Sequence, residues 1–247
     1  MKDLHCHLLP GMDDGARDLA DTEKMLKAAS DSGIEVLAAT SHYSREADQR
    51  YEEAFEKARL LAEKYSVTLL KGTEYDLQYI AEVPKEKLRT IGETKYLLVD
   101  MNCNYVVHSM PNLFFELKLA GFQIVFAHPE RMLPAKDLEE LLSLLEENDI
   151  FIQLDTGSLI GRYGSLARKN AFHILDRGNC HLLGNDAHKA RHFLFAECRS
   201  LLEKRYGKGL FELLAEENPS ALLSGGEIIP SPRRRSFWDR LLHRGKR

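Results

Sequence analysis

The sequence opens with MKDLHCHLLPGMDDG, residues 1–15, which holds two histidines followed by two acidic residues and a glycine. His5 and His7 are separated by one residue, and side chains at positions i and i+2 of a β-strand point to the same face. If residues 2–8 form a strand, the two imidazoles lie side by side and suit one cation. The pair alone is weak evidence, because a histidine on a strand is usually a satisfied polar residue. Its meaning depends on how the later strands end.

Short apolar runs alternate with helical patterns along the rest of the chain. Seven runs have the length and the Val, Ile, Leu and Phe content of buried parallel strands. They are residues 2–7, 35–42, 66–72, 96–101, 122–128, 150–155 and 181–186. Helices are predicted over residues 21–32, 47–65, 112–120, 136–148, 165–177, 192–206 and 210–215. This alternation predicts an α/β fold with right-handed crossovers, and seven units favour a closed or nearly closed TIM-like barrel over an open sheet.

The chemistry of such a barrel lies at the C-terminal ends of its strands. Each of the seven runs ends in, or is followed by, a histidine or a carboxylate. These strand ends hold His5 and His7 with Asp13 and Asp14 on the following loop, His42, Glu74, Asp100, His128 with Glu130 and Arg131 just beyond, Asp155, and Asp186 with His188. One polar residue after a strand is ordinary, but seven such ends with five imidazoles are hard to obtain by chance. Nitrogen and oxygen donors without sulfur suit Mn, Fe or Zn, and the set is large enough for two or three ions.

Other polar residues near these strand ends have weaker support. Asp13 is interpreted as a turn residue or as a partner of a ligand. Asp3 and Asp155 are interpreted either as partners of the histidines or as structurally satisfied residues. Both readings stay open on the sequence alone.

Composition excludes several classes of protein. The 247 residues, 44% of them hydrophobic, suit one large globular domain, and the net charge of −4 argues against a nucleic-acid-binding protein. We expect no secretory signal and no transmembrane helix, since no run of about 18 apolar residues occurs. The four cysteines are far apart, so neither a disulfide framework nor a thiolate zinc site is expected. A cytoplasmic location fits this cysteine usage.

The C-terminal residues 226–247 are predicted to form a basic tail outside the barrel domain of residues 1–225. Residues 230–247 hold seven Lys or Arg and one acidic residue, and the apolar residues Phe237, Trp238, Leu241 and Leu242 fall on one helical face. Two readings stay open. The tail is either solvated and flexible, or a short amphipathic helix that contacts an anionic membrane or an acidic segment of a partner.

Several motifs resemble those of the polymerase-and-histidinol-phosphatase (PHP) superfamily of metal hydrolases. Within it, the chain is similar to bacterial tyrosine-protein phosphatases encoded with capsule and exopolysaccharide genes. The matching motifs are Asp3-Leu-His-Cys-His7, Leu9-Pro-Gly-Met-Asp-Asp-Gly15, Ala39-Thr-Ser-His42, Gly72-Thr-Glu74, Ala127-His-Pro-Glu-Arg131, Asn185-Asp-Ala-His188 and Glu217-Asn-Pro219. The resemblance implies a distorted (β/α)7 barrel, the PHP fold, with a three-metal site. It implies a first ion on His5, His7, Glu74 and Asp186, a second on Glu74, Asp100 and His128, and a third on Asp14, His42 and His188.

The resemblance also implies an activity, which is the hydrolysis of phosphotyrosine. It implies two or three Mn²⁺ ions as the cofactor, with Fe or Zn as alternatives. The implied substrate is the tyrosine-rich tail of a membrane tyrosine kinase that controls polysaccharide export. No Cys-x5-Arg stretch is present, so the cysteine phosphatase route is excluded. Arg131 and Arg191 are the candidates for catalytic contacts with the phosphoryl oxygens, with surface ion pairs as the alternative.

Two departures from the family pattern stand out. Asp100 occupies a ligand position that usually holds Glu, and Tyr43 follows His42 where a basic residue or His is more usual. Three functions remain possible on the sequence. They are a phosphotyrosine phosphatase, another PHP phosphoesterase such as a histidinol-phosphate phosphatase or a nuclease, and a non-catalytic scaffold. The near-complete ligand set argues against the scaffold, and the acidic body argues against the nuclease. The sequence leaves the oligomeric state open.

Overall fold

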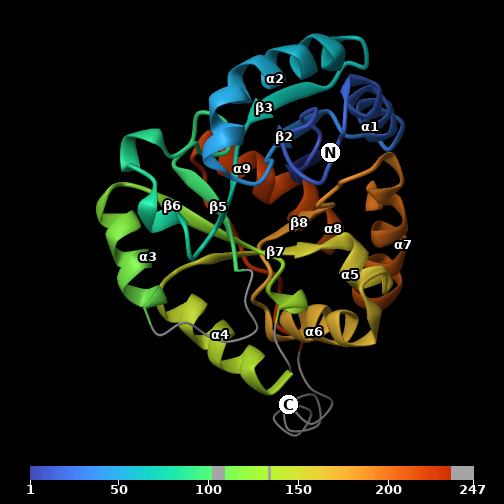
Figure 1. The fold of residues 1–247 in the computed structure, drawn as a ribbon. Helices are drawn as coiled ribbons and strands as arrows, with labels where there is room; N and C mark the ends of the chain where they lie inside the picture. The colour runs from blue at the N-terminus through green and yellow to red at the C-terminus, as the bar shows by residue number, and fades with distance from the viewer. Residues whose placement is uncertain (102–108, 133–134, 235–247) are drawn as a thin grey trace, which may run out of the picture.

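The computed structural model describes residues 1–101, 109–132 and 135–234, which form a mixed α/β fold with parallel strands (Figure 1). The strands are β1 (Lys2–Cys6), β2 (Val36–Ala39), β3 (Thr68–Lys71), β4 (Glu74–Asp76), β5 (Tyr96–Asp100), β6 (Gln123–Ala127), β7 (Phe151–Asp155) and β8 (Leu182–Gly184). They form two parallel sheets, in the orders β1-β2-β3 and β4-β5-β6-β7-β8. The predicted α/β class is confirmed, and each of the seven predicted strands contains an observed one.

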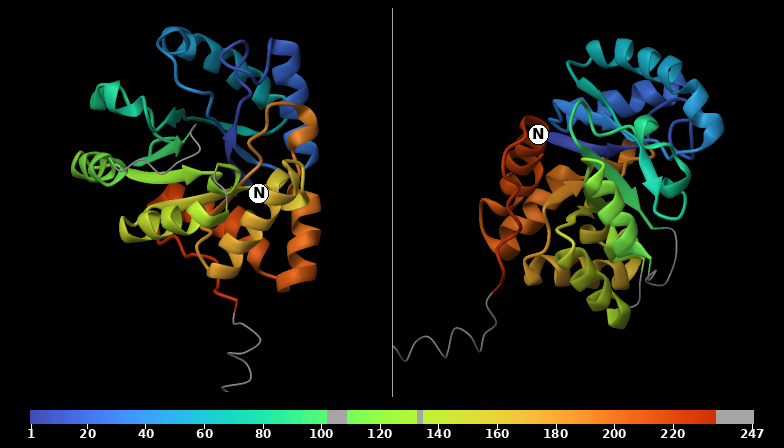
Figure 2. Two further views of the ribbon diagram at one scale, coloured as in Figure 1. Left: turned by 60° about the horizontal axis from the view of Figure 1, so that its bottom comes forward. Right: turned by 90° about the vertical axis from the view of Figure 1, so that its left-hand side faces the viewer.

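Helices follow the strands and surround the two sheets (Figures 1 and 2). They are α1 (Leu19–Asp31), α2 (Arg45–Glu63), α3 (Met110–Leu119), α4 (Ala135–Glu147), α5 (Thr156–Ile160), α6 (Gly164–Arg177), α7 (Phe195–Tyr206), α8 (Leu210–Glu212) and α9 (Asn218–Ser224). A π-helical segment, Leu213–Glu217, joins α8 to α9. In the described part of the chain, no helix combines the length and the apolar character that a membrane span needs. Residues 235–247 of the basic tail lie outside the described residues, so both readings of the tail stay predictions.

The predicted third strand is split into β3 and β4, which belong to different sheets. Gly72 lies at the break, and its N–H donates to the Tyr51 hydroxyl at 3.0 Å. The same hydroxyl donates to the Gly72 carbonyl at 2.8 Å. A buried side chain from α2 therefore occupies the backbone groups that a continuous strand would use. A Cβ on Gly72 would lie 2.8 Å from Thr40 Cγ2, so the close approach requires glycine.

The two sheets are joined at both junctions by single-residue bridges. Cys6 bridges to Ala187 beyond β8, and His42 bridges to Glu74 of β4, both in parallel orientation. The strands thus do not form one continuous ladder. The structure confirms parallel sheets in an α/β fold, and the closed (β/α)7 barrel stays a prediction.

Alternate residues of β5 face two different cores. Leu97 and Val99 join the large cluster beneath the surrounding helices. Tyr96 and Leu98 join a smaller cluster on the other side of the sheet, together with Leu222 of α9. Because the side-chain period of a strand is two, the next residue in the second row is Asp100, at the end of the strand. The row Tyr96, Leu98 and Asp100 therefore runs from the packed smaller cluster to a carboxylate at the end of the strand.

The hydroxyl of Tyr51 gives a direct test of the split strand. Tyr51→Phe should lower the free energy of unfolding by about 1–3 kcal/mol, because it leaves the buried backbone groups of Gly72 without their partner. Chemical denaturation measures this loss. Tyr65→Phe is the matched control, since its hydroxyl contacts Glu23 at 3.1 Å nearer the surface. Equal losses in both variants would contradict the assigned role.

Candidate metal centre and active site

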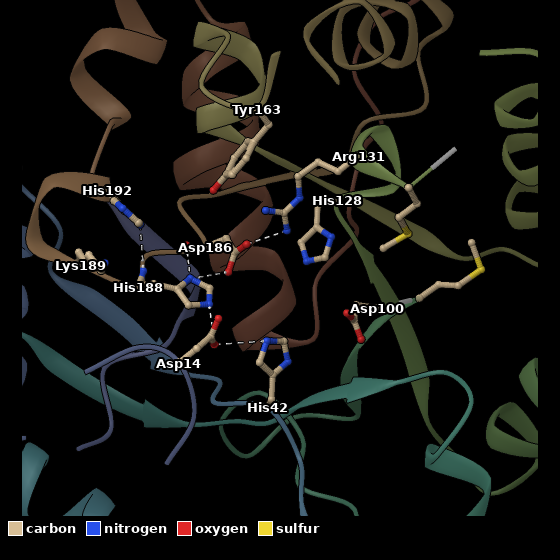
Figure 3. A pocket seen from close by; sticks show the side chains of 12 residues that line it. Asp14, His42, Asp100, His128, Arg131, Tyr163, Asp186, His188, Lys189 and His192 are labelled. Carbon is tan, nitrogen blue, oxygen red and sulfur yellow. Dashed lines mark hydrogen bonds and ion pairs between the residues drawn. The ribbon is translucent and has the colours of Figure 1, made fainter. Parts of the chain in front are cut away.

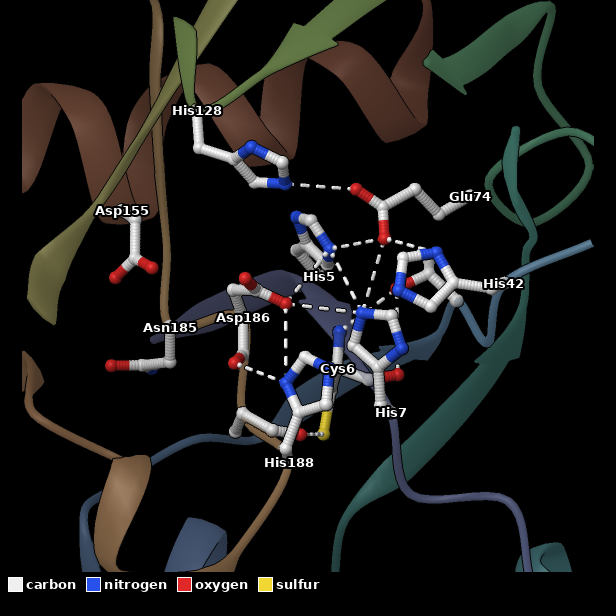
Figure 4. Close-up of polar contacts among 12 residues, drawn as sticks. His5, Cys6, His7, His42, Glu74, His128, Asp155, Asn185, Asp186 and His188 are labelled. Carbon is white, nitrogen blue, oxygen red and sulfur yellow. Dashed lines mark hydrogen bonds and ion pairs between the residues drawn. The ribbon is translucent and has the colours of Figure 1, made fainter. Parts of the chain in front are cut away.

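The predicted ligands come together at the C-terminal ends of the strands (Figures 3 and 4). They come from β1 and the loop after it (His5, His7, Asp14), the segment after β2 (His42), β4 (Glu74), the end of β5 (Asp100), and the segments after β6 and β8 (His128, Asp186, His188). Several of them line a pocket of about 590 Å³. The arrangement follows from parallel strands, whose C-terminal ends meet at one edge.

The deepest group consists of His5, His7, Glu74 and Asp186, all of them buried. Figure 4 shows these side chains pointing toward one another. The Nε2 atoms of His5 and His7 are 3.2 Å apart. Glu74 Oε2 lies 3.2 Å from each of these two nitrogens. Asp186 Oδ1 lies 3.2 Å from the nitrogen of His5 and 3.0 Å from that of His7.

The same four residues fit a metal ion better than they fit one another. Glu74 Oε2 and Asp186 Oδ1 are buried and accept no hydrogen bond, although ring nitrogens surround them at about 3 Å. A buried carboxylate oxygen without a partner is costly, so such atoms call for an explanation. Two carboxylate oxygens and two imidazole nitrogens that converge on one point form a donor set for Mn, Fe or Zn.

The protonation behaviour of the cluster supports the same interpretation. Burial opposes a charge on His5, but Glu74 and Asp186 outweigh it and raise the pKa of His5 to about 9. Burial and the neighbouring charge of Glu74 raise the pKa of Asp100 to about 8. Both raised pKa values mean that His5 and Asp100 hold protons in the metal-free cluster, where the protons offset the negative charge of the buried carboxylates. A bound cation supplies the same positive charge and leaves the nitrogens and oxygens free to coordinate it.

Two further groups of ligand atoms surround this centre. One contains His42, Glu74 and Asp100, and the other contains His7, Asp14, His42 and His188. In each group the ligand atoms lie within 4.8 Å of one another. Glu74 belongs to two of the three groups, as the predicted bridging role requires. Asp14, His42 and His188 are together, as predicted for a third ion.

His128 stands slightly apart from these compact groups. Its Nε2 contacts Glu74 Oε1 at 2.9 Å, on the other oxygen of the bridging carboxylate. Burial and the nearby Arg131 lower the pKa of His128 to about 4, so its ring is neutral and able to coordinate a metal. His42 occupies the place near Asp100 that the resemblance assigned to His128.

The backbone at two ligand positions is strained. His128 has a φ of 38° and Asp186 a φ of 43°, both in the left-handed region. Residues other than glycine adopt this region at a cost of about 1–3 kcal/mol, and they cluster at functional sites. Helix and strand patterns carry no signal for this feature, so sequence reasoning did not anticipate it.

Two side chains behind the ligands orient the imidazoles. His5 Nδ1 lies 2.7 Å from Gln153 Oε1, and His7 Nδ1 lies 2.7 Å from Asp13 Oδ2. Because an amide or carboxylate oxygen can only accept, each Nδ1 donates and each Nε2 faces the cluster. The partner role of Asp13 is thus observed, and its other oxygen also accepts from the Gly15 N–H at 3.0 Å. Gln153 was not predicted; its signal was an uncharged polar residue inside a buried strand.

Asp3 and Asp155 contact groups other than imidazoles. Asp3 Oδ2 accepts from the Asn185 amide at 2.8 Å, and its Oδ1 lies 3.2 Å from the His5 backbone nitrogen. Asp155 accepts from the Gly157 N–H at 2.6 Å and pairs with Arg131 at 3.2 Å. Of the two open readings, the structure supports structural satisfaction for Asp3, whereas Asp155 Oδ2 is buried with the Arg131 ion pair and no hydrogen bond.

The two predicted arginines occupy different places. Arg131 lines the metal pocket, where its guanidinium contacts Asp186 at 2.7 Å and lies 4.7 Å from the ring centre of Tyr163 (Figure 3). Burial opposes its charge, but the carboxylates of Asp155 and Asp186 outweigh it and raise the pKa of Arg131, which keeps it charged. Arg191 is exposed and lines a neighbouring hollow.

Comparison with known proteins identifies the family. The model of the family described as "Capsular polysaccharide synthesis, CpsB/CapC" matches residues 1–224. The chain belongs to the CpsB/CapC family. It is 33% identical to the tyrosine-protein phosphatase YwqE of Bacillus subtilis, over 94% of this chain and 95% of that protein. It is 26% identical to the putative tyrosine-protein phosphatase CapC of Staphylococcus aureus, over 94% and 92% of the two chains.

The fold agrees with a solved structure of the CpsB/CapC family. The match, with a TM-score of 0.82 and 32% identity, covers 96% of this chain and 99% of the other. That chain comes from work on YwqE from Bacillus subtilis and CpsB from Streptococcus pneumoniae, described as unique metal-dependent tyrosine phosphatases. The predicted resemblance to capsule-type tyrosine phosphatases is confirmed.

The two departures from the expected CpsB/CapC pattern have different consequences. Tyr43 packs against Tyr75, with ring centres 5.4 Å apart, and the described residues that line the metal pocket do not include it. Asp100 lines the pocket, and its Oδ1 has no hydrogen-bond partner. The shorter acid therefore still reaches the cluster, beside His42 and Glu74.

Asp100 can be tested as a ligand. Asp100→Asn should weaken the binding of one ion by about tenfold or more, because it removes a charged donor from a coordinating group. Asp100→Glu should keep the binding. Metal titration followed by mass spectrometric metal analysis measures both effects. Asp76→Asn is the control, since Asp76 on β4 accepts from the Gln78 N–H; unchanged affinity in Asp100→Asn would remove Asp100 from the ligand set.

Proposed function

We propose that this chain is a metal-dependent tyrosine-protein phosphatase. The observation that carries the proposal is the pair of buried oxygens, Glu74 Oε2 and Asp186 Oδ1, that face two imidazoles without a hydrogen bond. Similarity to YwqE, named a tyrosine-protein phosphatase, and to CapC, named a putative one, supports the substrate class.

Each part of the site has a role in this proposal. The predicted ligands would hold the ions: His5, His7, Asp14, His42, Glu74, Asp100, His128, Asp186 and His188. When bound, divalent ions activate water for attack and neutralise phosphoryl oxygens. Gln153 and Asp13 hold the two strand-one imidazoles in the orientation that presents Nε2.

Arg131 would bind the phosphoryl oxygens that face the pocket. Asp155 and Asp186 each pair with one terminal nitrogen of its guanidinium, and Tyr163 packs against the guanidinium. The fork is thus fixed before substrate arrives, which is how an arginine stabilises charge on a phosphoryl group without reorganising. For Arg191 the exposed position supports contact with substrate outside the metal pocket.

The pocket walls fit an aromatic leaving group. Met101, Met132 and Tyr163 line the pocket beside the ligand cluster. Thioether and aromatic side chains pack well against a phenyl ring, and a serine phosphate would leave this surface uncovered. This favours phosphotyrosine over phosphoserine.

We further propose the finer features that the resemblance implies. Mn²⁺ is the proposed ion, in two or three sites, with Fe and Zn as alternatives that the donor set also accepts. The proposed substrate is a tyrosine-phosphorylated bacterial kinase or another phosphoprotein, and the proposed location is the cytoplasm. Residues 1–225 are proposed to be a distorted (β/α)7 barrel, and residues 226–247 a basic tail that contacts an anionic membrane or an acidic partner.

A substrate panel tests the proposed activity. Purified protein with Mn²⁺ should hydrolyse a phosphotyrosine peptide faster than a phosphoserine peptide, histidinol phosphate or single-stranded DNA. Chelation should abolish the activity, and added Mn²⁺ should restore it, because buried carboxylates and imidazoles form the site. Preference for histidinol phosphate or DNA would favour another phosphoesterase, and inactivity on every substrate would favour a scaffold.

A further inference from the structure

We propose that the hollow beside the metal pocket binds an anionic side chain next to the phosphotyrosine of the substrate. The inference rests on the proposed phosphatase function and adds the local chemistry of the substrate to it. We call this hollow the basic shelf. Its charged lining consists of Arg17, Lys24, Lys189 and Arg191 with Asp21, beyond the shared residue Asp14.

The basic shelf and the metal pocket share a wall. The shelf has a volume of about 560 Å³, and Asp14, His188 and Lys189 line both cavities. Figure 3 shows these three side chains at the edge of the metal pocket. Because consecutive residues of an extended peptide are about 3.3–3.6 Å apart, residues beside a phosphotyrosine in the pocket pass over the shelf.

The backbone beneath the shelf is anchored on both sides. On one side, Thr22 of α1 donates to the Leu8 carbonyl at 2.8 Å, which ties the first turn of the helix to the loop after β1. On the other side, the His188 N–H donates to His192 Nδ1 at 3.2 Å, and Arg162 donates to the Arg191 carbonyl at 3.4 Å. The backbone that carries the cations of the shelf is therefore anchored in both segments.

The shelf has an excess of positively charged side chains. Arg17 and Lys24 both pair with Asp21, at 2.6 Å and 3.1 Å. Among the described residues, no carboxylate forms an ion pair with Lys189 or Arg191. Asp14 faces His188 at 3.2 Å and belongs to a predicted metal group. The shelf thus holds four cations and, besides Asp14, one carboxylate, Asp21, which pairs with two of them.

This positive excess points to an anionic ligand. The chain as a whole carries a net charge of −4, so the shelf is a local exception beside the reaction site. Exposed ion pairs such as those on Asp21 are weak, and both of their cations remain able to bind an incoming anion. A carboxylate or a second phosphate next to the phosphotyrosine meets this charge, whereas a neutral or basic neighbour does not.

Peptide substrates and a charge reversal test the shelf. Wild-type protein should hydrolyse a phosphotyrosine peptide flanked by Glu about tenfold more efficiently in kcat/KM than its Gln counterpart at low ionic strength, with the advantage falling at high salt. Lys24→Glu should lose this preference and keep its activity on free phosphotyrosine. A doubly phosphorylated peptide forms a separate arm. A gain for that peptide alone would identify the anion as a second phosphate.

The matched control is Lys27→Glu. Lys27 lies three residues further along α1, pairs with Asp31 at 2.6 Å and is not part of the shelf lining. It makes the same change in net charge, so it reports any long-range effect. No preference for either anionic peptide in the wild type, or an equal loss in both variants, would overturn the inference. Failure to hydrolyse free phosphotyrosine would instead count against the proposed function.

Discussion

Replacing His5 with alanine should reduce phosphotyrosine hydrolysis by at least about 1,000-fold, because it removes a donor from the deepest metal group. Glu74 and Asp186 would then face a cavity with one imidazole fewer. The metal content of the purified protein should fall in parallel. The strand itself should persist, since β1 pairs with β2 through its backbone.

Three measurements separate this result from unfolding. Circular dichroism reports the fold, mass spectrometry reports the bound metal, and a phosphotyrosine assay reports turnover. His173→Ala is the matched control, because His173 is half-exposed on α6 and contacts Glu139. Asp186→Ala should lose activity in the same way as His5→Ala. Full activity of His5→Ala with normal metal content would contradict the assigned metal centre.

Arg131→Lys should lower kcat/KM for phosphotyrosine by about 100-fold, although the charge is kept. Two terminal nitrogens of the Arg131 fork contact Asp155 and Asp186 at 3.2 Å and 2.7 Å. A lysine ammonium is a single point and lacks the planar fork that spans both acids and would face the phosphoryl group in the proposed role. Steady-state kinetics with free phosphotyrosine, and competitive inhibition by inorganic phosphate, measure the effect.

Arg191→Lys is the comparison for this variant. Arg191 is exposed on the basic shelf, so its replacement should change hydrolysis of free phosphotyrosine little. Equal losses in the two variants would place both arginines on the phosphoryl group. An unchanged rate in Arg131→Lys would restrict Arg131 to holding Asp186 in place.

The fold class was predictable from hydrophobic periodicity, because the apolar pattern of each strand or helix is contained in one short segment. An apolar run with a period of two or with both faces buried predicts a strand wherever it occurs, and Leu97 to Val99 is such a run. The split of the third strand was not predictable in this way. It depends on the Tyr51 hydroxyl, which arrives from α2 and binds both backbone groups of Gly72.

The candidate ligands followed from the rule about strand ends together with the family resemblance, but their partners did not. His5 and His7 were identifiable from spacing, because a period of two is a property of the backbone. Gln153 was missed, since its contact with His5 joins strands that are far apart in sequence. Asp155 was assigned no certain role, and only the packing of the segment after β6 showed that it pairs with Arg131.

The sequence by itself determined the α/β class, the places of the seven predicted strands along the chain and the residue types at the strand ends. These properties depend on local periodicity and on the chemistry of each side chain. The tertiary structure decided which groups meet: two buried oxygens beside two imidazoles, Arg131 beside Asp155 and Asp186, and four cations in one hollow with Asp21. Such contacts depend on distances between segments remote in sequence, which packing sets and local patterns do not contain.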